Sequence, residues 1–202
     1  MLEQAQLRAQ AAEVDIETIH LAWADDWVAA GLAANSVDVA IASRSIATLD
    51  MKDALLKLTN IARRTCCITL PVGCTPRMDP RVLEACGVNN THGSDYQYAW
   101  NILFNEGFHP NASYINSERR DTYATPDDAF EDFDRMLREV IAPERTDDLK
   151  AARAKLHQWL QDNIVENERA GELDAKGRPE GVLRLREPRI ITWGFISWAP
   201  NR

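Results

Sequence analysis

The chain of 202 residues is acidic: 31 aspartates and glutamates against 23 lysines and arginines give a formal net charge of -8. This sign opposes binding to nucleic-acid phosphates. No stretch reaches the roughly 18 apolar residues of a membrane span, and no basic segment followed by an apolar one opens the chain. We therefore expect a cytoplasmic protein that forms a single domain over residues 1 to 202, with neither nucleic acid nor membrane as a partner.

The first third of the chain predicts alternating helices and strands. Apolar residues at near-helical spacing predict a helix in MLEQAQLRAQ, followed by a strand at 16–23 (IETIHLAW) and a short helix at 27–32. The nearly continuous apolar run that opens VDVAIASRSI, from Val37, is typical of a strand buried on both faces of a parallel sheet. We expect this segment to be a central strand.

A further helix and strand complete this pattern. The segment from Met51 to Ala62 has helical apolar spacing, with Asp50 as its expected N-cap, and TCCITLPV (65–72) predicts another buried strand. The order β-α-β-α-β favours a parallel sheet with right-handed crossovers. The four cysteines, two of them adjacent in this strand, make a disulfide framework improbable.

The second half predicts helical, cap-like segments, at 74–130 and 125–180, before the last strands. The first elements expected there are a loop that contains a short helix (74–94), a helix over 95–106 and a strand at 111–117. A helix that begins at Pro126 after Thr125, a helix over 147–165 and a turn at 175–181 follow. The last elements are a final pair of strands, VLRLRE and RIITWGFISW.

Three segments, MLEQAQLRA, the acidic end of IHLAWADDW, and VDVAIASRSI, resemble in order and spacing the class I S-adenosylmethionine-dependent methyltransferases. In that family an "ML..A..RA" helix follows the second strand, an acidic motif beside the adenine ends the third, and the fourth commonly carries an aspartate among apolar residues. MKDALLKLTNIARR and CCITLPVG are similar to the next helix and strand. The resemblance covers residues 1 to about 73 and implies an α/β, Rossmann-like methyltransferase fold with S-adenosyl-L-methionine as cofactor.

The resemblance also implies that the chain enters this fold partway. The expected fold is a mostly parallel sheet with helices on both faces and an antiparallel C-terminal strand pair, and the first two strands are missing. Those strands carry the family's Gly-rich loop and its ribose-binding acid, so we expect weakened cofactor binding. We further expect the natural product to extend upstream of Met1, or a second chain to fill the gap; exposed sheet edges would favour a homo-oligomer.

The resemblance assigns the cofactor to six residues: Trp23, Asp25, Asp26, Trp27, Ser43 and Arg44. The two aspartates would accept from the adenine amino group, or simply cap the next short helix. The two tryptophans would wall the adenine, or belong to the core. The serine and arginine follow a strand, where ligands bind in open α/β sheets, although a surface ion pair would equally explain the arginine.

Polar residues of the cap-like segments are the candidates for holding the methyl acceptor. We select Arg77, Tyr114 and Arg119, with His92 and Arg120 as further polar groups, because arginine holds carboxylates or phosphates bidentately. His109, before Pro110, is the best general-base candidate by residue type. Metal binding by Cys74, Cys86, His92 and His109 is disfavoured because their spacing matches no compact zinc pattern.

The resulting hypothesis is a methyltransferase acting on an unidentified small molecule. The alternative is a non-catalytic, truncated or degenerate methyltransferase-like domain that acts by self-association or partner binding. An NAD-dependent dehydrogenase is disfavoured because residues 37–49 contain no Gly-x-Gly turn.

Overall fold

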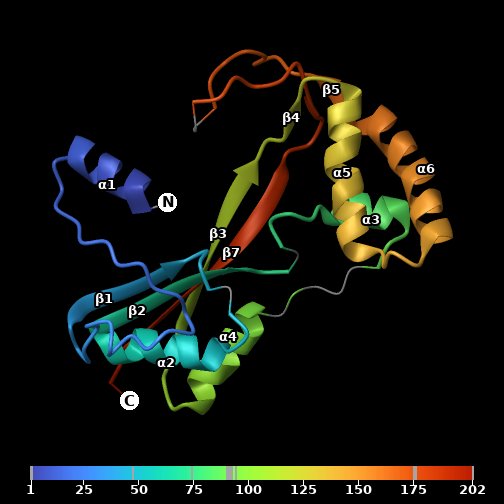
Figure 1. Ribbon diagram of the computed structural model, residues 1–202. Coiled ribbons are helices and arrows are strands. Elements are labelled where there is room, and N and C mark those ends of the chain that lie inside the picture. The colour runs from blue at the N-terminus through green and yellow to red at the C-terminus, as the bar shows by residue number, and fades with distance from the viewer. Residues whose placement is uncertain are drawn as a thin grey trace. The chain divides into compact units, whose positions relative to one another are not determined.

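The structure, a computed structural model, describes residues 2–46, 48–73, 75–89, 93, 95–174 and 177–201 (Figure 1). The chain divides into two compact units. Unit 1 comprises Met1–Ile68, Ala99–Asn111 and Ile196–Arg202, and unit 2 comprises Thr69–Tyr98 and Ala112–Phe195. The expectation of a mixed α/β chain with a mostly parallel sheet is confirmed.

Two sheets are formed by the described strands. The larger has the strand order β1-β2-β7-β3, and the smaller has the order β4-β6-β5. The larger sheet consists of β1 (Val37–Ser43), β2 (Ala62–Pro71), β3 (Asn111–Arg119) and β7 (Arg189–Trp198); the smaller consists of β4 (Thr122–Tyr123), β5 (Ile164–Glu166) and β6 (Leu183–Leu185).

The N-terminal segment forms one of its three predicted elements. Helix α1 (Leu2–Ala11) is present but buries no residue. The predicted strand at 16–23 is wrong: these residues are irregular, and Ile16 and Ile19 are 40% and 41% exposed. A strand is stable only when another strand satisfies its backbone groups, and none of the described strands pairs with this segment. The predicted helix at 27–32 is also wrong, since those residues form turns.

Strand β1 forms where predicted, but its expected central position is wrong. It is the outermost described strand of the larger sheet, with Ala40 and Ala42 buried and Val39 and Ile41 exposed. Helix α2 (Met51–Ile61) packs against β1 (Figure 1). A strand at the rim has fewer neighbours to cover its second face, so an apolar run there does not guarantee burial.

Helix α2 and strand β2 confirm the sequence prediction closely. The side chain of Asp50 accepts a hydrogen bond from the Asp53 backbone N–H, which caps the helix as expected. Strand β2 follows at once, and residues 66–70 of it are buried between neighbours β1 and β7. Of the cysteines, Cys66, Cys67 and Cys86 are free and buried, and burial raises the pKa of Cys66 to about 12. Cys74 lies outside the described residues.

Unit 2 is built on three helices, α3 (Pro80–Cys86), α5 (Pro126–Val140) and α6 (Thr146–Asn163). Helix α5 begins with the predicted Thr125–Pro126 start, and Thr125 and Asp128 form a reciprocal capping box. Both α3 and α5 pack against α6 (Figure 1). Their shared core includes Leu83, Leu137 and Leu156, each no more than 1% exposed.

A buried carboxylate also joins α5 to α6. Asp134 accepts two hydrogen bonds from Arg153, at 2.6 and 3.0 Å, and pairs with Arg138 at 2.9 Å. These guanidinium groups, Arg153 foremost, lower the pKa of Asp134 below its ordinary value. The interface of the two helices therefore combines apolar burial with a paired charge.

The predicted pairing of the last two strands is wrong. Strand β6 pairs antiparallel with β4 on one side and with β5 on the other, whereas β7 lies between β2 and β3. Because β6 already has a neighbour on each edge, it has no edge left for β7. The predicted helix over 95–106 and strand at 111–117 are confirmed as α4 (Asp95–Asn105) and β3.

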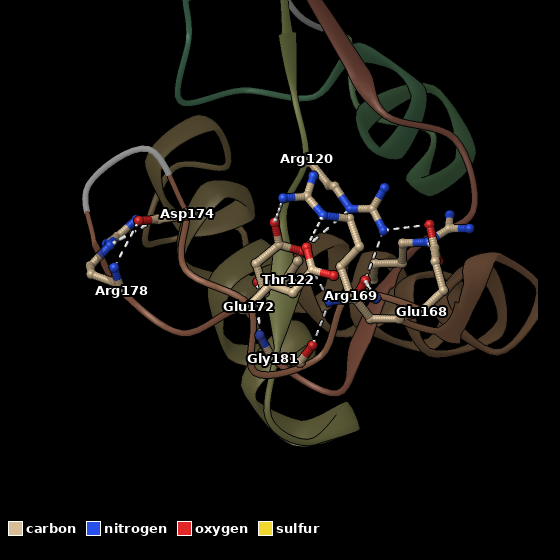
Figure 2. A network of polar contacts seen from close by, with 11 residues as sticks. Arg120, Thr122, Glu168, Arg169, Glu172, Asp174, Arg178 and Gly181 are labelled. Atoms are coloured by element: carbon tan, nitrogen blue, oxygen red, sulfur yellow. Dashed lines mark hydrogen bonds and ion pairs between the residues drawn. The ribbon is translucent and has the colours of Figure 1, made fainter.

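Ion pairs fix the loop that follows β5. Glu168 pairs with two guanidinium groups, 2.7 Å from Arg120 (Figure 2) and 2.8 Å from Arg184. These hydrogen bonds lower the pKa of Glu168 to about 2. Further along, Arg178 pairs with Asp174 at 2.8 Å across the predicted 175–181 turn, of which residues 175 and 176 lie outside the described part. Arg120 therefore has a structural partner in this loop.

Within the described residues, no helix is both long enough and apolar enough to cross a membrane.

Candidate functional site

Four of the predicted cofactor residues lie together in unit 1. We call Trp23, Asp25, Asp26 and Trp27 the indole–acid cluster. The two indole rings stack, with centroids 5.2 Å apart and an angle of 27° between their planes. Both tryptophans are half-buried and both aspartates are exposed. The cluster thus offers a flat apolar surface next to two carboxylates, although the segment is not the predicted strand.

Hydrogen bonds place this cluster beside the end of β1. The indole N–H of Trp23 donates to the Ser45 carbonyl at 2.8 Å, two residues beyond the strand. From α2, the Lys57 ammonium donates to the Trp23 and Asp25 carbonyls at 2.8 and 3.0 Å, and it pairs with Asp53 at 2.7 Å. In open α/β sheets, ligands bind outside the carboxyl ends of strands, which is where this cluster lies.

Each aspartate of the cluster caps a turn with one oxygen. Asp25 Oδ2 accepts from the Ala22 N–H at 2.7 Å, and Asp26 Oδ1 accepts from the Ala29 N–H at 3.0 Å. The alternative that these aspartates cap a short helix is not met as expected: residues 27–32 form turns, only Asp26 bonds forward into them, and Asp25 bonds back to Ala22. These hydrogen bonds occupy one oxygen of each exposed carboxylate, so the second oxygen of each remains able to accept from a ligand.

Ser43 and Arg44 lie at the carboxyl end of β1, and both side chains are exposed. Arg44 has a φ of 56°, in the left-handed region that non-glycine residues seldom occupy. The chain therefore turns sharply on leaving the strand, and this turn precedes the Ser45 carbonyl that holds Trp23.

Two of the three predicted acceptor residues line one cavity in unit 2. This cavity, of about 270 Å³, is lined by Arg77 and Arg119 together with Asp121 and Arg189, and by residues of α5. Asp121 is shared: its Oδ1 accepts from Arg119 at 2.6 Å, and its Oδ2 lies 3.4 Å from Arg189. We call this space the arginine cavity.

Tyr114, the third predicted acceptor residue, pairs instead with Tyr96 of α4. Their hydroxyl oxygens are 3.3 Å apart and their ring centroids 5.9 Å apart. Burial, and then the contact with Tyr114, raise the pKa of Tyr96 to about 12. The Tyr96 ring lies directly against the backbone of Gly194 in β7, where a Cβ atom would overlap it.

His109, the predicted general base, is not among the residues that line the arginine cavity. His109 is exposed, between α4 and β3, and His92 lies outside the described residues. Among the residues that are described, no three His, Cys, Asp or Glu side chains converge to hold a metal ion.

The predicted site residues divide between the two units. Unit 1 holds Trp23, Asp25, Asp26, Trp27, Ser43, Arg44 and His109, and unit 2 holds Arg77, Tyr114 and Arg119. Sequence reasoning missed Lys57, Asp121 and Arg189. The ion pair of Lys57 could have been predicted from the sequence, because Lys57 lies four residues after Asp53 on a predicted helix, a spacing typical of ion pairs. Arg189 gave no signal, since the sequence around it does not distinguish a buried arginine from an exposed one.

Comparisons with known proteins give limited similarity. No family model matches the chain. A protein of Haemophilus influenzae, described only as uncharacterized, is 32% identical over 105 residues, which are 51% of this chain and 37% of that protein. The crystal structure of a candidate sarcosine dimethylglycine methyltransferase from Galdieria sulphuraria aligns with a TM-score of 0.38 and 12% identity, over 98% of this chain and 63% of its own.

Proposed function

We propose that this chain provides the adenine side of an S-adenosyl-L-methionine site in a methyltransferase that acts on a small molecule. The observation that carries the proposal is the indole–acid cluster beside the carboxyl end of β1. Stacked indoles suit the flat face of a purine, and carboxylate oxygens suit its exocyclic amino group. The order of sequence motifs that resembles class I methyltransferases supports the same assignment.

The residues present fit the base of such a cofactor. The outer face of the stacked Trp23–Trp27 pair would contact the purine face, and the oxygens of Asp25 and Asp26 that do not cap a turn would accept from its amino group. When bound, the cofactor supplies an activated methyl group, so the protein mainly has to align donor and acceptor. Lys57 contributes by holding the carbonyls of Trp23 and Asp25, which fixes the cluster on α2.

Calorimetric titration of the full chain with S-adenosylhomocysteine, adenosine, inosine and NAD tests this proposal. We expect weak, saturable binding of S-adenosylhomocysteine, with adenosine retaining most of its affinity and inosine, which lacks the amino group, binding less. Trp27→Leu should weaken adenosine about tenfold or more, because stacking on an aromatic side chain contributes roughly 1–3 kcal/mol per base.

Asp15→Asn is the matched control for Asp26→Asn, because both aspartates are exposed in the same irregular segment. Asp26→Asn should reduce the ratio of the adenosine affinity to the inosine affinity, while Asp15→Asn should leave this ratio unchanged. The proposal is wrong if neither nucleoside binds, if Trp27→Leu has no effect, or if NAD binds better than S-adenosylhomocysteine.

We also propose a second function, self-association through β1. This strand is outermost in its sheet and leaves Val39 and Ile41 48% and 65% exposed. Uncovered apolar side chains on a terminal strand favour pairing with a second copy. Sedimentation equilibrium should show a dimer that Ile41→Lys dissociates, with Gln4→Lys, at an exposed position of α1, as a control for the added charge. A wild-type chain that stays monomeric at all concentrations excludes this function.

A further inference from the structure

The arginine cavity holds more positive charge than its own acids neutralise. Four arginines line it, Arg77, Arg119, Arg135 and Arg189, against three acids, Asp121, Asp132 and Glu139. The lining therefore keeps one positive charge in excess. A cavity with this balance attracts an anion, and a single negative charge brings it to neutrality.

Two of these arginines are fixed by the protein itself. Arg119 donates to Asp121 at 2.6 Å and to the Pro76 carbonyl at 3.2 Å. Arg189, only 7% exposed, donates to the Met78 carbonyl at 2.8 Å. Its Nε–H is buried and has no hydrogen-bond partner among the described residues. A buried donor without an acceptor is costly, so Arg189 keeps one unsatisfied N–H group in the chain alone.

Arg77 is the group available to a ligand. Its side chain is exposed, and the described part of the chain gives its guanidinium neither a hydrogen bond nor an ion pair. A free guanidinium presents a fork of N–H donors that matches a carboxylate in two parallel hydrogen bonds. Arg77 therefore differs from Arg119 and Arg189, whose donors are largely committed to this chain.

We propose that the arginine cavity binds a small monocarboxylate, with Arg77 as the bidentate contact. A dianion such as a phosphate monoester would exceed the surplus charge and leave an unbalanced negative charge beside Asp132 and Glu139. The cavity also contains Phe133 and Met136, which suit an apolar or aromatic body attached to the carboxylate. The proposal that a carboxylate binds depends only on the residues of the cavity. The further assignment of this carboxylate as the methyl acceptor rests on the proposed function.

Three probes that share one aromatic body test this proposal: benzoate, phenylphosphonate and benzamide. At mildly alkaline pH, benzoate is a monoanion, phenylphosphonate is predominantly a dianion, and benzamide carries no charge. Calorimetry at matched ionic strength measures affinity, and ¹⁵N-edited NMR of the arginine side chains locates the contact. We expect benzoate to bind best and to shift the Nε–H signal of Arg77.

Arg77→Gln should weaken benzoate binding by about tenfold or more, because hydrogen bonds to a charged partner are among the strong ones. Arg64→Gln, at an exposed position of β2, changes the net charge equally and should leave binding unchanged. Circular dichroism of both variants verifies that they fold.

Three results would overturn the assignment: no benzoate binding by the wild-type chain, equal or better binding of phenylphosphonate or benzamide, or benzoate binding that Arg77→Gln does not weaken. Failure here differs from failure of the methyltransferase proposal, because these titrations contain no nucleoside. Benzoate binding together with absent nucleoside binding would keep the carboxylate site and remove its identification as an acceptor site.

Discussion

Residues 2–36 and the helix pair α5 and α6 are stabilised by different kinds of interaction. Every described residue of the first region is exposed or half-buried. In the second region, apolar side chains such as Phe133, Leu137 and Leu156 are buried, and Asp134 is paired across the two helices. Both regions have apolar residues in their sequence, so composition alone does not distinguish them.

The difference shows that an apolar pattern forms an element only when it finds a partner. The apolar faces of α5 and α6 pack against each other, whereas IETIHLAW has no strand beside it in the described part of the chain. What holds the first region is polar: the Lys57 ammonium and the Trp23 indole N–H bond to carbonyl groups. We therefore expect substitutions in the two regions to have different costs.

Leu156→Ala should have the largest effect. Leu156 is 0% exposed in the α6 core, and removing a buried leucine side chain lowers the free energy of unfolding by about 2–5 kcal/mol. Urea denaturation followed by circular dichroism measures the change. The matched variant Leu7→Ala, in α1 where leucine is 53% exposed, should stay within about 0.5 kcal/mol. Equal losses would remove the contrast between the regions.

Asp134→Asn should lower the free energy of unfolding by about 1–3 kcal/mol at pH 7, because hydrogen bonds from two arginines lose their charged partner. The pKa of Asp134 is lowered in the folded chain, so its stabilisation is present above the ordinary value near 3.8 and is lost as the pH falls through the lowered value. Wild type and variant should therefore converge in acid. Asp132→Asn, more exposed on the same helix, is the control; a difference that persists in acid contradicts this linkage.

Lys57→Met should cost about 1 kcal/mol, since it removes the hydrogen bonds that Lys57 donates to the Trp23 and Asp25 carbonyls. Tryptophan fluorescence should also shift to longer wavelength as the indole–acid cluster becomes more hydrated. Lys52→Met, on the same helix and paired with Glu106, controls for the lost charge and should leave the fluorescence unchanged. An unchanged spectrum in Lys57→Met would show that another contact holds the cluster.

Ile19→Ser should have the smallest effect, within about 0.5 kcal/mol, because Ile19 is 41% exposed in an irregular segment. If these residues formed the strand that their sequence predicts, the loss of a β-branched apolar side chain would cost roughly twice as much. Denaturation in urea distinguishes the two outcomes, with Thr18→Ser as a milder change at the neighbouring position.

The sequence predicted the elements whose signals are local. The Asp50 cap, the Thr125–Pro126 start and the apolar stripes of α2, α5 and α6 depend on neighbours in the chain, and all are confirmed. Position in a sheet depends on distant strands. This is why β1 was expected at the centre and β6 was expected beside β7.

The candidate site shows the same limit. Trp23, Asp25, Asp26 and Trp27 are close in sequence, so their grouping could be read from it. Arg77 and Arg119 were selected for their residue type, but Arg189, the buried arginine that completes their cavity, comes from the other end of the chain. The contact of Tyr114 with Tyr96 likewise depends on α4 and β3, which are separated in sequence. No pattern within a single segment carries such information.

The contact between Tyr96 and Gly194 has a consequence for how this protein can diverge. Because a Cβ atom at position 194 would overlap the Tyr96 ring, a side chain can enter there only if the aromatic ring at position 96 moves or is replaced. The two positions should therefore change together in related chains. Gly194→Ala should be poorly tolerated alone and restored by a smaller residue at 96, a compensation that would also separate Tyr114 from its hydroxyl partner.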